Sequence, residues 1–81
     1  MSSLKYILGP YGPVIFPETY THSDIAKGVK GEIKSAGFLY IDWNETEQRL
    51  DSKPFGESIS LDLKSRPEDK AIIDRFLNND F

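Results

Sequence analysis

The segment from Glu57 to Leu77 constrains the fold more than any other part of the chain. Residues 59–63 alternate apolar and polar side chains, with the period of two that is typical of a strand with one buried face. Ser65 and Glu68 then have the spacing of a capping box, in which each side chain satisfies a free backbone N–H at a helix start. Apolar residues follow at helical spacing, namely Ile72, Ile73, Phe76 and Leu77. The segment therefore predicts a strand that leads directly into an amphipathic helix.

Two short apolar runs near the N-terminus predict a β-hairpin. The runs 4–8 and 14–16 flank a loop, residues 9–13, that carries two glycines and two prolines. Because Pro13 and Pro17 cannot donate an N–H to a ladder, we expect the second strand to be short and to lie at a sheet edge. A partner's strand could join such an edge.

The middle of the chain predicts a short helix and then a central strand. Thr21 or Ser23 can cap a helix start, and Gly28 and Gly31 favour its end about two turns later. The run 32–43 that follows is apolar on both faces, which is typical of a strand covered on each side. Gly37 within this run indicates a bend or bulge.

The remaining segments complete the predicted order of elements. Residues 44–48 predict a charged turn, 49–51 a weak strand and 52–54 a second turn, and 78–80 end the last helix. The order is β-β-α-β-β(-β)-α, and the fold class is α+β. We expect a small, mainly antiparallel sheet of 4–5 strands, with a short middle helix and a C-terminal amphipathic helix packed on it. At 81 residues, the chain is expected to form a single domain over 1–81.

Composition speaks against catalytic, metal and cofactor sites. The chain has no cysteine and one histidine, too few ligands of those types for a typical zinc site. His22, Ser23 and Asp24 are the residue types of a catalytic triad, but adjacent side chains diverge, and a helix cap explains them better. The acidic group at 42–51 lacks the spacing of a calcium-binding loop, so a solvated hairpin tip is expected. We therefore expect no enzyme, no metal and no cofactor.

The charge distribution bears on the kind of partner. The net charge is −3; residues 1–40 carry about +1 and residues 41–81 carry −4. Nucleic-acid binding favours a basic surface, so it is not the expected function, although Lys27, Lys30 and Lys34 form a local basic group. No apolar run approaches the roughly 20 residues of a membrane span, and the N-terminus lacks the pattern of a cleaved signal. A cytoplasmic location without membrane contact is expected.

Aromatic residues are the remaining functional signal. Phe16, Phe38 and Phe76 fall on predicted apolar faces and are expected in the core. A further five aromatics are harder to place there: Tyr11, Tyr20, Tyr40, Trp43 and Phe55. Such side chains favour protein interfaces and also stack on single-stranded bases.

The expected function is a small non-catalytic protein-interaction module with a binding surface at Tyr40, Trp43 and Phe55. A homodimer that buries Trp43 would explain the same aromatics. The alternative is a single-stranded nucleic-acid-binding domain that uses sheet aromatics and the local lysines.

Arg66 is a further candidate binding residue, because it lies at a predicted helix start, where anions bind. The capping box explains the same segment without any ligand. The stretch 60–69, followed by an amphipathic helix, resembles segments of small bacterial or phage-type proteins, and this resemblance implies no particular activity.

Overall fold

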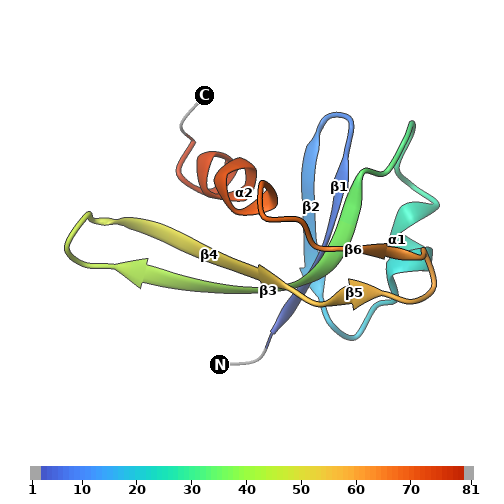
Figure 1. Cartoon of the computed structure of the whole chain (residues 1–81), viewed down its shortest axis with the longest axis horizontal. Coiled ribbons are helices and arrows are strands. Elements are labelled where there is room, and N and C mark those ends of the chain that lie inside the picture. The colour runs from blue at the N-terminus through green and yellow to red at the C-terminus, as the bar shows by residue number, and fades with distance from the viewer. Residues whose placement is uncertain (1–2, 80–81) are drawn as a thin grey trace.

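Four antiparallel strands form the main sheet, in the spatial order β2-β1-β3-β4 (Figure 1). The computed structural model describes residues 3–79. The strands are β1 (Leu4–Gly9), β2 (Gly12–Pro17), β3 (Ser35–Asn44) and β4 (Arg49–Phe55). A small second sheet pairs β5 (Glu57–Ser58) with β6 (Leu63–Lys64), and the helices are α1 (His22–Ala26) and α2 (Asp69–Leu77). The predicted α+β class and element order are confirmed.

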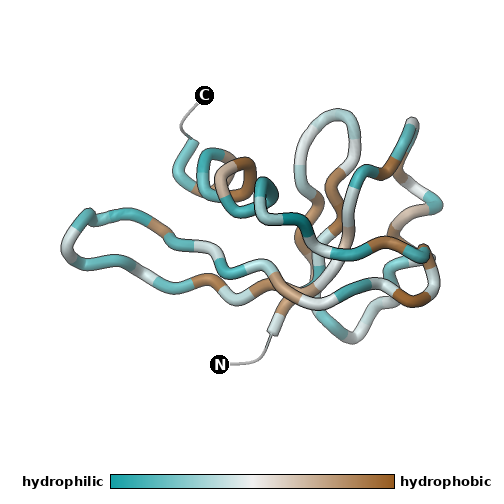
Figure 2. The backbone as a smooth tube through the Cα atoms, in the orientation of Figure 1, coloured by the Kyte–Doolittle hydropathy of each residue, from teal (hydrophilic) through white to brown (hydrophobic). Residues whose placement is uncertain are grey.

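The main sheet lies between two small cores. Helix α2 packs on one face, over a cluster of buried residues: Tyr6, Leu8, Leu39 and Ile73. The opposite face carries a second cluster, Ile7, Phe16 and Ala36, against which side chains of α1 and of the β5–β6 segment pack. Successive side chains of a strand point to opposite faces, so β1 and β3 contribute to both cores. Hydrophobic residues lie along β1 and in part of α2, whereas the residues of the turn between β3 and β4 are hydrophilic (Figure 2).

The β1–β2 hairpin closes more tightly than expected. Gly9 pairs with Gly12, which leaves only Pro10 and Tyr11 in the loop. Gly12 has a φ of 120°, a conformation that side chains disfavour, and this explains the glycine at the exit of the turn. The prediction that β2 lies at a sheet edge is confirmed.

The predicted strand over 59–63 is wrong. Residues 59–62 form the turn between β5 and β6 instead, and Ile59 is 88% exposed. A local hydrogen bond stabilises this turn, because Ser58 Oγ accepts from the Leu61 N–H. Asp62 adopts a φ of 54°, a left-handed conformation that Asp tolerates better than most residues. Alternation alone did not reveal that the polar side chains bond to their own backbone.

The predicted capping box is also wrong. Helix α2 begins at Asp69, and its N-cap Glu68 makes no side-chain hydrogen bond to the cap. The carboxylate of Asp69 instead accepts a hydrogen bond from the Arg66 N–H, at 3.0 Å. The Ser65 N–H, which a capping box would pair with Glu68, donates instead to the Gly56 carbonyl.

Two further predictions need correction. The sequence predicts a turn at residues 52–54, but strand β4 continues through them. The sheet tolerates Pro54 because β4 is an edge strand, where the missing N–H breaks no ladder bond. Phe76, expected in the core, is 45% exposed, since Ile73 is the residue of α2 that is fully buried against the sheet.

Other local predictions are confirmed. Thr21 caps α1 by accepting a hydrogen bond from the Asp24 N–H, and β3 is a central strand. Residues 45–48 form the predicted turn, and α2 ends at Leu77 with Asn78 as its C-cap. Asp80, also assigned to the helix end, lies outside the described residues.

Candidate functional site

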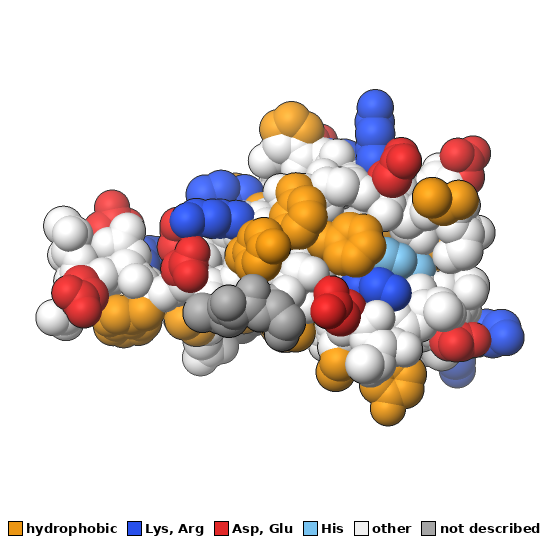
Figure 3. Space-filling model, turned by 90° about the horizontal axis from the view of Figure 1, so that it is seen from below, with side chains coloured by type: hydrophobic (Ala, Val, Ile, Leu, Met, Phe, Trp, Pro, Cys, Tyr) orange, Lys and Arg blue, Asp and Glu red, His pale blue; other side chains and the backbone are white. Residues whose placement is uncertain are grey.

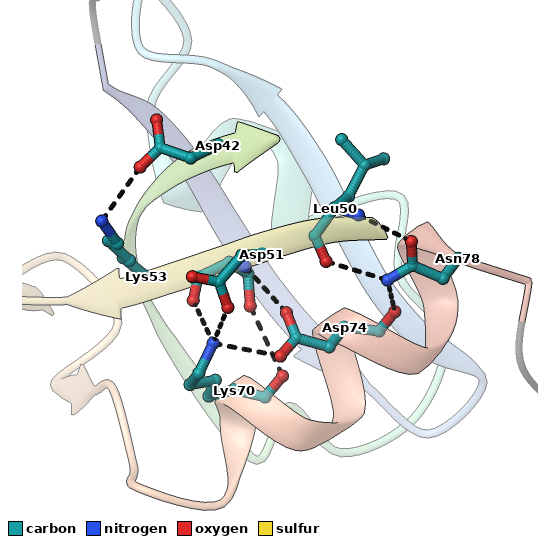
Figure 4. A network of polar contacts seen from close by, with 8 residues as sticks. Asp42, Leu50, Asp51, Lys53, Lys70, Asp74 and Asn78 are labelled. Atoms are coloured by element: carbon teal, nitrogen blue, oxygen red, sulfur yellow. Dashed lines mark hydrogen bonds and ion pairs between the residues drawn. The ribbon is translucent and has the colours of Figure 1, made fainter. Parts of the chain in front are cut away.

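Side chains of α2 close the free edge of β4 (Figure 4). Asn78 accepts from the Leu50 N–H and donates to the Leu50 carbonyl. Asp74 accepts from the Ser52 N–H at 2.7 Å, and Lys70 donates to the Ser52 carbonyl at 2.8 Å. Four residues of a helix span about 6 Å and two residues of a strand span about 6.6 Å. Side chains four residues apart on α2 can therefore reach backbone groups two residues apart on β4. The helix therefore occupies the edge that an added strand would need.

The other edge of the sheet offers few donors. Pro13 and Pro17 have no N–H, so each forms a non-hydrogen-bonded pair with its partner residue in β1. Such pairs alternate with hydrogen-bonded ones along the ladder, so Ile15 also forms a non-hydrogen-bonded pair. The backbone groups of these three residues point away from the sheet, and Ile15 has the only N–H among them. The edge strand expected to accept a partner's strand is thus poorly suited to do so. Neither edge of the main sheet favours strand addition.

The face of the sheet opposite α2 carries a line of ring contacts. We define the aromatic row as Phe16, His22, Phe38, Phe55 and Tyr40. Consecutive ring centroids in this row lie 5.6, 5.8, 5.7 and 5.0 Å apart. His22 meets its two neighbours edge-on, whereas the last three rings are stacked. The row crosses from β2, over α1, to β3 and β4.

His22 anchors the buried part of the row. Its side chain is buried, and its Nε2 lies 2.8 Å from the Gly37 carbonyl oxygen. A carbonyl only accepts hydrogen bonds, so His22 Nε2 carries the proton and donates it. The nearby Lys5 ammonium lies 5.9 Å from the centroid of the Phe38 ring and donates to the Tyr20 carbonyl. His22 therefore has a structural role between α1 and β3.

The other end of the row faces solvent. Tyr40 is 40% exposed and Phe55 is 39% exposed, although the two rings stack on each other. Hydrophobic side chains gather in the middle of this side of the molecule, next to the histidine (Figure 3). Lys53, opposite Tyr40 in the ladder, forms an ion pair with Asp42 at 3.0 Å. The exposed end of the row is thus an apolar surface of stacked rings with the Lys53–Asp42 ion pair beside it.

The predicted binding residues do not form one surface. Tyr40 and Phe55 lie together, as expected. Trp43, 57% exposed, lies on the opposite face of β3, because it is an odd number of positions from Tyr40. Arg66 lies at the start of α2 and binds the Asp69 carboxylate through Nε and Nη2, both at 3.0 Å. The sequence analysis did not place Phe38 or His22 in this surface, because ring contacts between separate elements have no local signal.

A buried polar cluster joins β1 to the start of α2. The Tyr6 hydroxyl donates to Asp69 Oδ2 at 2.6 Å, and both side chains are fully buried. Burial opposes ionisation of Asp69, but the hydrogen bonds from Tyr6 and Arg66 outweigh it and hold the pKa of Asp69 below its usual value. Burial and the neighbouring carboxylate raise the pKa of Tyr6. The buried Ser35 hydroxyl lies beside this pair and lowers the pKa of both groups, although no partner in the described part of the chain meets it with good hydrogen-bond geometry.

The described residues 3–79 contain no group of three or more His, Asp or Glu side chains that could hold a metal. Within that range, neither helix has the length and apolar composition needed to cross a membrane. Hollows on the surface are lined by Lys34, Arg66 and the Pro10–Tyr11 turn, away from the aromatic row. The exposed aromatic end of the sheet is therefore the best candidate site.

In comparisons with known proteins, the chain matches no family model, no curated protein and no solved structure.

Proposed function

We propose that this chain is a small non-catalytic protein-interaction module that binds its partner through the exposed end of the aromatic row. One observation carries the proposal: Tyr40 and Phe55 stack at 5.0 Å between centroids, yet each leaves about two fifths of its surface in solvent. The rings are held before any partner arrives, so little side-chain entropy remains to be lost on binding. Aromatic side chains held in this way are typical anchors of protein interfaces.

The closed edges of the sheet support binding at a face. Strand addition needs a row of free backbone donors and acceptors. Side chains of α2 occupy these groups at Leu50 and Ser52, and prolines remove donors from β2. A partner that binds this sheet without rearranging it therefore contacts side chains on a face.

The buried Tyr6–Asp69 pair is unsuited to acid–base catalysis. General acid–base catalysis at neutral pH needs a group whose pKa lies near 7 and which can reach a substrate. In the Tyr6–Asp69 pair, the pKa of the acid is lowered and that of the phenol is raised, away from neutrality in both cases. Both side chains are also fully buried.

Single-stranded nucleic acid is the alternative ligand, because bases stack on exposed rings. Binding of that kind also requires cations for the phosphates. Lys53 beside the rings is paired with Asp42, and Lys27 lies 3.9 Å from Asp24. Lys5, over the Phe38 ring, makes no ion pair with a described residue, but the net charge of the chain is −3. The overall charge therefore favours a protein partner over a nucleic acid.

The test compares two variants as baits for proteins in a lysate of the source organism. The double variant Tyr40→Ser, Phe55→Ser removes the surface, and Tyr20→Ser is the matched control, since Tyr20 is 54% exposed outside the aromatic row. We expect the wild type and the control to retain one defined protein and the folded double variant to lose it. Equal retention by all three baits contradicts the proposal. Retention of nucleic acid that moderate salt removes supports the alternative.

A further inference from the structure

A second apolar surface lies at the β1–β2 turn, away from the aromatic row. Tyr11, Pro13, Ile72 and Phe76 line a hollow of about 280 Å³, together with Gly12 and Arg75. Three of these side chains are exposed: Tyr11 at 94%, Phe76 at 45% and Ile72 at 37%. Small-molecule sites usually range from about 300 to 1,000 Å³. A hollow below that range suits a single large side chain.

Basic side chains surround this hollow. Two adjoining hollows share its wall at Gly12. Lys30 lines one of them, and Lys34 lines the other together with Arg66 and its ion-pair partner Glu68. Within residues 3–79, no carboxylate lies within ion-pairing distance of Lys30 or Lys34. The hollow therefore favours an apolar anchor that carries acidic neighbours. We call the 280 Å³ hollow and these lysines the turn groove.

The chain itself carries such an anchor. Trp43, more than half exposed, lies near the end of the β3–β4 hairpin, which projects from the body of the molecule (Figure 1). Residues 42–51 around it contain four acidic side chains and one basic one, a net charge of −3. Glu45 and Glu47 make no ion pair with another described residue. We call residues 42–51 the acidic arm.

We propose that the acidic arm of one copy docks in the turn groove of another, with Trp43 as the anchor. The arm and the β1–β2 turn lie far apart in Figure 1, so one chain cannot fill its own groove. Because the two surfaces differ, the contact is head-to-tail and can repeat from copy to copy. This self-association involves neither Tyr40 nor Phe55, so its test is independent of the test of the function proposed above.

Trp43 is the only tryptophan, so its fluorescence reports the docking directly. We expect self-association of the intact protein in sedimentation velocity at about 0.05 M salt, with a blue shift of the emission as concentration rises. At about 0.5 M salt the association weakens, because exposed charges are screened. A protein that remains monomeric up to about 1 mM overturns the proposal.

Variants locate the contact. Trp43→Ser removes the anchor and Phe76→Glu blocks the groove, and each is expected to weaken association about tenfold or more, as for an interface anchor. An equimolar mixture of the two restores association but stops at dimers, since one copy keeps only its groove and the other only its arm. Tyr20→Ser is the control and leaves association unchanged. Association that survives Trp43→Ser, or a mixture that stays monomeric, overturns the proposal.

A charge reversal separates this contact from binding to another protein. Lys30→Glu with Lys34→Glu abolishes self-association, and we expect the further substitutions Glu45→Lys and Glu47→Lys in the same chain to restore it, because every contact must then form between the exchanged charges. Failure of this exchange, with both variants folded, overturns the assignment of these charges.

Discussion

The side-chain amide of Asn78 makes both hydrogen bonds that a neighbouring strand would make to Leu50. Its Oδ1 accepts from the Leu50 N–H at 2.8 Å, and its Nδ2 donates to the Leu50 carbonyl at 2.9 Å. Asp74 and Lys70 continue the same pattern at Ser52, one helical turn and then two turns earlier. A helix thus satisfies backbone groups that an edge strand would otherwise present to other chains.

Asn78→Leu tests this edge closure. The variant keeps a similar side-chain volume and leaves both Leu50 groups without a partner, so we expect the unfolding free energy to fall by about 1–3 kcal/mol. Hydrogen exchange at the Leu50 amide accelerates. Asn78→Asp is the graded control, because it retains the acceptor for the Leu50 N–H and loses the donor. Unchanged exchange at Leu50 in Asn78→Leu would show that the amide does not protect this edge.

The buried Asp69 predicts loss of stability in acid. Its pKa is lower in the folded state than in the unfolded chain, so its contribution is present above about pH 4, the unfolded value, and disappears as the pH falls through the folded value. Asp69→Asn removes the buried charge that Tyr6 and Arg66 bond, while Arg66 keeps Glu68 at 3.9 Å, and we expect a loss of about 1.5–3 kcal/mol at pH 7. Urea titrations between pH 2 and pH 7 measure this. A variant whose stability keeps the full acid dependence of the wild type contradicts the assignment.

Tyr6→Phe removes one hydrogen bond from the same cluster. The hydroxyl donates to a buried carboxylate at 2.6 Å, and bonds to charged groups contribute about 1.5–3 kcal/mol. We expect a destabilisation of that size at pH 7 that shrinks in acid, where Asp69 becomes protonated. Chemical denaturation at both pH values checks it; a loss independent of pH would mean that Tyr6 acts through packing alone.

Gly37→Ala tests a close approach of two strands. An added Cβ would lie 2.6 Å from the Phe55 carbonyl oxygen, and backbone cannot move aside as a flexible side chain can. We expect a loss of about 1–3 kcal/mol, the usual range for overpacking. Gly28→Ala is the matched control, since its Cβ would make an ordinary contact at 3.6 Å. Equal melting temperatures for the two variants would remove this explanation for the glycine.

The sequence predicts elements whose causes are local. Thr21 caps α1 three residues ahead of Asp24, and a run that is apolar on both faces marks β3. The start of α2 could not be predicted in this way, because Asp69 is held by Tyr6, 63 positions earlier in the chain. Tertiary contacts of this kind override local capping preferences.

The candidate site was predictable only in part. Tyr40 and Phe55 were expected to be surface aromatics, and the register of β3 and β4 brings them together. Alternation along the strand already predicts Trp43 on the face opposite Tyr40, so the two residues could not share one surface. The spacing of Lys70, Asp74 and Asn78 at four-residue intervals shows a polar stripe on α2, but nothing local identifies the strand edge that it meets.

Photo-crosslinking tests the central claim most directly. A photoreactive phenylalanine analogue replaces Tyr40 in one variant and Tyr20 in another, and each is irradiated in a lysate of the source organism. If the exposed end of the aromatic row contacts a partner, position 40 gives one defined protein adduct and position 20 does not. No adduct at position 40, or the same set of adducts at both positions, would contradict a binding surface at Tyr40 and Phe55.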